Sequence, residues 1–155
     1  MLDKLRRDVR RHSVLVLAGL VVLVLGALTG AAALAAPPGE PISAIERELV
    51  IMVNAERAKV GAPPLIVNYS LMQAAYVHNE YMADVGKLAH EGIGDGTPRD
   101  RIAATGYKAA DFAENVAWGQ PNVREVMWGP DGKDGWMNSP GHRRNILDRT
   151  LTDIG

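Results

Sequence analysis

Apolar residues recur at helical spacing in the stretch that follows Ser43. Four of them fall on one face of a helix: Ile45, Leu49, Met52 and Val53. Ser43 with Glu46 three residues later matches a capping box, and Gly61 ends the pattern together with the prolines that follow it. The pattern predicts a helix that begins after Ser43 and ends before Gly61.

A second helical pattern follows a brief extended piece, "PLIVNYS". Its apolar face carries five residues: Leu71, Ala75, His78, Met82 and Val85. Ser70 with Gln73 matches another capping box, and Gly86 stands where a glycine commonly ends a helix. These signals predict a helix from about Ser70 to Gly86.

Shorter helices are expected further along the chain. Thr97 as a cap predicts a helix over 98–105, and another is expected over 122–128. Ser139 is a cap followed by proline at the first helical position, a favoured place for proline. This start predicts a helix that runs to about Leu147.

The residue patterns of two other segments predict strands. In "DFAENVAWG" every second residue falls on one face of an extended chain: Phe112, Glu114, Val116 and Trp118. The last residues, "LTDIG", have the pattern of a strand that opens. Helices and strands together predict an α+β domain.

The first 36 residues have the layout of an export signal. A basic head precedes an uncharged run, and Ala33-Leu34-Ala35 offers a small-residue cleavage site. The alternative is a membrane anchor, because residues 14–34 carry no charge and a bilayer takes about 20 apolar residues to span. Either way the domain is expected outside the cytoplasm, secreted or anchored, with 14–34 contacting the membrane in the anchored case. We assign 1–36 to the signal peptide or anchor, 37–44 to a linker and 45–155 to one domain.

Composition narrows the function classes. There is no cysteine, so a disulfide framework, a thiolate nucleophile and a cysteine-based zinc site are excluded. Beyond Ala35 there are 12 Lys and Arg against 16 Asp and Glu, a net charge of −4. Nucleic acid is not an expected partner, because phosphate binding needs clustered positive charge. No nucleophile motif or phosphate-binding glycine motif is present.

Three polar residues are candidates for a site. His90 follows the second helix in a glycine-rich loop, and His142 falls at the third position of the helix that Ser139 caps. The partial positive charge of that helix end disfavours a protonated ring, and a neutral imidazole can bind metal or accept a proton. Glu114 shares a face with apolar residues, which is costly for an unpaired carboxylate. Two histidines and a carboxylate can hold zinc with one open position.

Structural roles are the alternatives for these polar residues. His78 is expected to be a core histidine with its hydrogen bonds satisfied. His142 is alternatively part of a helix cap, and Glu114 is alternatively a structural carboxylate bonded to backbone amides.

Four motifs in this order resemble bacterial CAP domains, named after cysteine-rich secretory proteins, antigen 5 and pathogenesis-related proteins. The motifs are "VNAERAKVGAPPL", "AAYVHNEYMADVGKLAH", "AENVAWG" and "WMNSPGHRRNIL", and the resemblance covers roughly 45–155. It implies a secreted three-layer α-β-α sandwich. It also implies a cleft with two histidines and two acidic residues, which in some members binds a divalent metal.

The resemblance assigns cleft residues one by one. "LAH" supplies His90, "AENVA" supplies Glu114, and "PGHR" supplies His142. The second acid has no clear match, because counting on from Trp136 reaches Ser139 and counting on from Trp128 reaches Asp131. The metal ligands expected from the resemblance are therefore His90, Glu114 and His142, with Asp131 as a weaker candidate.

The family continues past "DIG" with one or two more strands. The sheet is therefore expected to be truncated at its C-terminal strands, with an unpaired edge. The hydrophobic N-terminal helix is expected to be separate from the sandwich.

Three functions stay open at this point. The leading hypothesis is an exported binding or interaction module, for which lipid or another small hydrophobic ligand is plausible by resemblance. The second is a hydrolase that uses zinc or another divalent metal, with Glu114 as ligand or general base. The third is a scaffold without activity. Binding is favoured over catalysis because no nucleophile is recognisable.

Overall fold

The computed structural model describes residues 42–155. The predicted signal peptide or anchor at 1–36, including the apolar run 14–34, lies outside the described residues. Within 42–155, none of the helices combines the length and apolar character that crossing a membrane requires.

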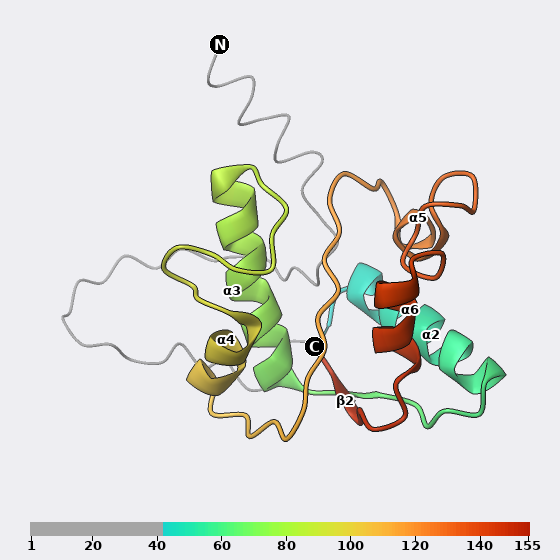
Figure 1. The fold of residues 1–155 in the computed structure, drawn as a ribbon, viewed down its shortest axis with the longest axis horizontal. Coiled ribbons are helices and arrows are strands. Elements are labelled where there is room, and N and C mark those ends of the chain that lie inside the picture. Colours follow the sequence, from blue (N-terminus) through green and yellow to red (C-terminus); the bar gives the residue numbers. More distant parts are fainter. Residues whose placement is uncertain (1–41) are drawn as a thin grey trace, which may run out of the picture.

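Helices form two layers with a short sheet between them (Figure 1). One layer holds α3 (Tyr69–Val85) and α4 (Pro98–Ala104), and the other holds α2 (Ala44–Lys59), α5 (Val123–Trp128) and α6 (Pro140–Leu147). The sheet between them pairs β1 (Ile66–Val67) with β2 (Asp153–Ile154) in parallel. The predicted α+β class and the α-β-α layering are confirmed, with a sheet of two short strands.

Local capping signals explain most helix starts. Ser43 caps α2 in a capping box with Glu46, and Thr97 caps α4 in one with Asp100. The predicted cap of α3 at Ser70 is wrong by two residues. The Asn68 side chain accepts hydrogen bonds from the backbone N–H groups of Ser70 and Leu71, so the helix begins earlier.

The predicted strand over Phe112–Trp118 is wrong. This segment is extended, but it pairs with no strand of the described residues. Two of its carbonyls are used by side chains instead: Asn145 Nδ2 donates to the Glu114 carbonyl at 3.2 Å, and Trp136 Nε1 donates to the Val116 carbonyl at 3.1 Å. Alternation predicts an extended chain, but strand pairing also needs a neighbour.

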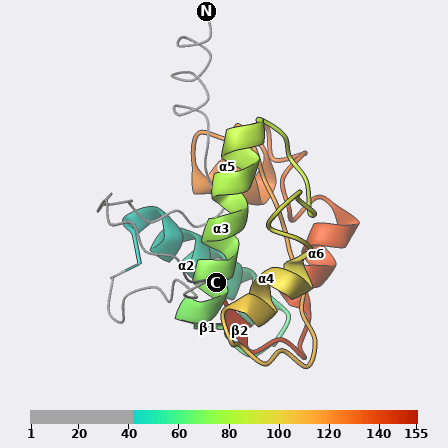
Figure 2. The same ribbon diagram turned by 90° about the vertical axis from the view of Figure 1, so that its left-hand side faces the viewer.

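The main apolar cluster lies in the layer of α2, α5 and α6. Its buried members are Leu49, Val53, Leu65, Ala117, Val123, Val126, Met127, Trp136 and Ile146. Figure 2 views the molecule from the other layer, with α3 and α4 in front. There two of the buried side chains are polar, His78 and Arg101. Buried charged groups occur in both layers, because α2 also buries Glu46 and Arg57.

Candidate functional site

His90 and Glu114 meet although they lie on separate segments. His90 lies in the loop after α3, and its Nδ1 is 2.8 Å from Oε1 of Glu114 in the extended segment. Because an ionised carboxylate only accepts hydrogen bonds, Nδ1 carries the hydrogen. The Nε2 lone pair of His90 is then free. The His90 side chain is 51% exposed, so this nitrogen belongs to a solvent-accessible group.

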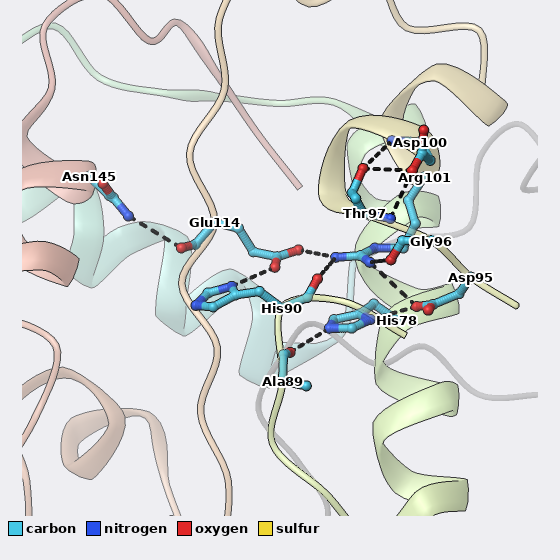
Figure 3. Close-up of polar contacts among 10 residues, drawn as sticks. All are labelled: His78, Ala89, His90, Asp95, Gly96, Thr97, Asp100, Arg101, Glu114 and Asn145. Carbon is cyan, nitrogen blue, oxygen red and sulfur yellow. Dashed lines mark hydrogen bonds and ion pairs between the residues drawn. The ribbon is translucent and has the colours of Figure 1, made fainter. Parts of the chain in front are cut away.

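Arg101 holds the other side of the Glu114 carboxylate (Figure 3). Its Nη2 donates to Oε2 of Glu114 at 2.6 Å, and its side chain is only 2% exposed. Sequence reasoning missed this residue. Nothing in the sequence distinguishes it from Arg99 on the same helix, which is exposed.

His78 is a buried histidine with both ring nitrogens bonded, as predicted. Nδ1 lies 2.5 Å from Oδ2 of Asp95, and Nε2 lies 2.7 Å from the carbonyl of Ala89. Both partners accept hydrogen bonds, so this arrangement suits a doubly protonated ring beside an ionised Asp95. Ala89 directly precedes His90, so His78 also fixes the loop that carries the candidate histidine.

His142 lies in the opposite helical layer, in the first turn of α6. Asn115, next to Glu114 in the chain, donates from Nδ2 to the His142 carbonyl at 3.1 Å. Burial lowers the pKa of His142, and the charge of the nearby His90 lowers it further. The fold therefore brings His90, Glu114 and His142 to one region. Ser139 occupies the N-cap position, but its side chain makes no capping hydrogen bond.

His142 is expected to make the domain less stable in mild acid. Its pKa is lowered in the folded state, so below about pH 6.5 the unfolded chain binds more protons than the folded one. Stability is therefore lost as the pH falls from 7.5 to 5. In His142→Gln this part of the loss is absent. Urea unfolding in EDTA at pH 7.5 and pH 5 measures the loss of stability in both proteins. An equal loss in the parent and in His142→Gln would contradict the prediction.

The arrangement does not fit a metal centre with three protein ligands. Both oxygens of Glu114 are engaged, by His90 and Arg101. Asp131 is exposed in the loop after α5, and no hydrogen bond or ion pair of the described residues joins it to the cleft. Within 42–155, no three His, Asp or Glu side chains are grouped to hold one ion. Two imidazoles remain as donors, whereas a catalytic zinc site takes three protein ligands.

A cavity of about 540 Å³ adjoins this polar cluster, between the two helical layers. Arg101, Glu114, Asn115 and Asn145 line one part of it. Apolar residues from both layers line most of the rest, among them Val53, Leu71, Ala75, Ile102, Phe112 and Leu151, and further polar residues such as Lys108 and Asp111 also contribute. Arg101 and Glu114 therefore belong to both the polar cluster and the cavity wall, whereas His90 and His142 are not among the residues that line the cavity.

Comparison with known proteins places this geometry in a family. The sequence pattern of the CAP family, described as the cysteine-rich secretory protein family, matches residues 50–155. The uncharacterized protein YkwD of Bacillus subtilis (strain 168) is 36% identical over 114 residues, which are 74% of this chain and 42% of YkwD. The uncharacterized membrane protein YlbC of the same strain is 26% identical over 110 residues, covering 71% of this chain and 30% of YlbC.

A solved structure shares the fold. It is the crystal structure of an extracellular protein containing an SCP domain from Bacillus anthracis str. Ames. The match has a TM-score of 0.64 at 22% identity and covers 76% of this chain and 40% of that one. The chain spans less than half the length of each of these three proteins. The family match covers most of the chain and agrees with the layered fold, so the chain belongs to the CAP family.

Proposed function

We propose that this chain is an exported CAP-domain binding module that accepts a lipid or another small hydrophobic ligand. The cavity between the layers is the observation that carries the proposal. Its volume of about 540 Å³ lies within the range of small-molecule pockets, roughly 300–1,000 Å³. Its mostly apolar lining with a few convergent polar groups is also typical of such pockets.

The polar groups are placed to orient a ligand rather than to attack it. The Glu114 carboxylate is neutralised by Arg101 and bonded to His90, and none of the three is a nucleophile activated by a base. A metal-dependent hydrolytic step has less support, because no three His, Asp or Glu side chains among residues 42–155 are grouped to hold one ion. Binding is therefore the better-supported function for this site.

Export belongs to the same proposal. The basic head and the uncharged run of the sequence support it, and so does the likeness to a protein described as extracellular. Intact mass of the exported protein distinguishes cleavage after Ala35 from a retained anchor.

Narrowing the cavity is expected to weaken ligand binding. Ala75 on α3 lines the cavity, and phenylalanine there would occupy the space that an acyl chain needs. We expect Ala75→Phe to weaken binding of the fluorescent fatty acid cis-parinaric acid at least about tenfold, a change of about 1.4 kcal/mol. Fluorescence titration of the protein from residue 37 onward measures this.

Ala83→Phe is the matched control for this titration. Ala83 lies on the same helix but does not line the cavity. The Ala83→Phe variant should bind cis-parinaric acid with the same affinity as the parent protein. No saturable binding to the parent, or equal affinity in Ala75→Phe, would refute the proposal.

A further inference from the structure

The loop that carries His90 is tied by its carbonyl oxygens to two buried side chains. His78 Nε2 bonds the carbonyl of Ala89 at 2.7 Å. Arg101 donates from Nη2 to the carbonyl of His90 at 3.2 Å and from Nη1 to that of Gly96 at 2.9 Å. The loop is therefore fixed immediately before His90, at His90 itself and at its far end.

The buried charges alternate along a chain that leads to His90. Asp95 Oδ2 lies between His78 Nδ1 at 2.5 Å and Arg101 Nη1 at 3.5 Å. Arg101 Nη2 reaches Glu114, and the other oxygen of Glu114 accepts from His90. Figure 3 shows Glu114 between His90 and Arg101. Because each buried charge faces an opposite one, the cluster can remain ionised away from water.

We propose that Arg101 is the positioning residue of the cleft and sets the tautomer of His90. A guanidinium only donates hydrogen bonds, so the Glu114 oxygen that faces it must be an acceptor. The second oxygen of the carboxylate is then turned to His90 Nδ1–H. The neutral ring is then held with Nδ1–H toward Glu114 and with its Nε2 lone pair free.

The backbone of Glu114 is fixed independently, from the opposite layer. Asn145 on α6 donates to its carbonyl at 3.2 Å and to Oδ1 of Asn115 at 2.9 Å. Glu114 is therefore held by its backbone from α6 and by its side chain from α4. With the backbone fixed in this way, the direction of the carboxylate depends on Arg101.

Arg99 provides a matched control on the same helix. It is exposed, and its guanidinium lies 4.9 Å from the centre of the Phe112 ring rather than at Glu114. Removing it takes the same charge from α4 without touching the cluster.

Nitrogen-15 NMR of histidine in the full-length chain tests the proposal. The protein is measured in detergent micelles with EDTA and without ligand, at about pH 8, above the ordinary titration range of histidine. His90→Gln assigns the His90 signals. We expect Nδ1–H in the parent and in Arg99→Met, and loss of that preference in Arg101→Met. A folded Arg101→Met protein that keeps the Nδ1–H form would overturn the proposal.

Glu114→Gln is a second test that does not depend on whether Arg101→Met folds. Because the Arg101 guanidinium only donates hydrogen bonds, it should bond the oxygen of the new glutamine amide. The NH₂ group of that amide then faces His90. His90 Nδ1 must then accept, so the hydrogen moves to Nε2 and the tautomer reverses. Retention of Nδ1–H in Glu114→Gln refutes the proposal.

This inference rests on the proposed function only in treating Arg101 and Glu114, which line the cavity, as the polar groups that face the ligand. Both measurements are made on ligand-free protein. A chain that binds no fatty acid but reverses its tautomer in Glu114→Gln would contradict the binding function alone.

Discussion

Replacing Arg57 by methionine is expected to lower the free energy of unfolding by about 3–5 kcal/mol, because it leaves several buried acceptors without a donor. Arg57 on α2 is fully buried. Its guanidinium donates to four carbonyls, those of Pro63, Ile146, Asp148 and Leu151, at 2.7–3.1 Å. Methionine fills similar space but donates nothing. Urea unfolding at pH 7 measures the loss.

Two of those carbonyls connect Arg57 to the helix that carries His142. Ile146 and Asp148 lie at the C-terminal end of α6, the helix that carries His142, and Leu151 leads into β2. Burial lowers the pKa of Arg57, and Asp148 partly offsets this. Arg47→Met is the control, because Arg47 is exposed on the same helix and makes one bond to the Ile42 carbonyl. Similar stability losses in the two variants would contradict this role of Arg57.

Gly135→Ala is expected to destabilise the domain by about 3 kcal/mol, the upper end of the usual cost of overpacking. A Cβ at Gly135 would lie 2.2 Å from the backbone nitrogen of Trp128 and 2.4 Å from the carbonyl carbon of Met127. Neither atom can move without shifting the end of α5. The approach is close because Trp136 and Met137 donate backbone hydrogen bonds to the last turns of α5, at 2.9 and 2.8 Å.

Gly141→Ala separates this steric effect from the general effect of losing a glycine. A Cβ at Gly141 meets nothing within 4 Å, and the residue is helical. Because alanine is the better helix former by up to about 1 kcal/mol, this variant should be as stable as the parent or slightly more stable. Thermal melts of both variants measure the difference. A Gly135→Ala protein as stable as Gly141→Ala would refute the steric argument.

Local features of the fold were predictable from the sequence. The starts of α2 and α4 follow from side chains that bond backbone groups three residues away. The C-terminus of α3 follows from Gly86, which is in the left-handed conformation at a φ of 65°. The α3 cap is less certain from sequence, because Asn68 and Ser70 are both good capping residues and the structure uses Asn68. Such signals act within one turn, so a short window of sequence contains them.

Part of the candidate site was predictable as well. Residue chemistry and the family motifs selected His90, Glu114 and His142, and the structure brings these three to one region. The same reasoning could not reject Asp131, which lies apart from them. A motif count gives a position in the chain, whereas a site depends on position in space.

The amino-acid sequence alone determined the helices, most of their caps and the CAP family. Only the tertiary structure decided that residues 112–118 pair with no strand within 42–155, that Arg101 rather than Arg99 is buried against Glu114, and that Arg57 reaches the end of α6. The reason is physical. Caps and periodicity act between residues a few positions apart, whereas the hydrogen bonds of Arg57 reach carbonyls up to 94 positions away along the chain. A charged side chain acquires such partners only when separate elements have packed around it.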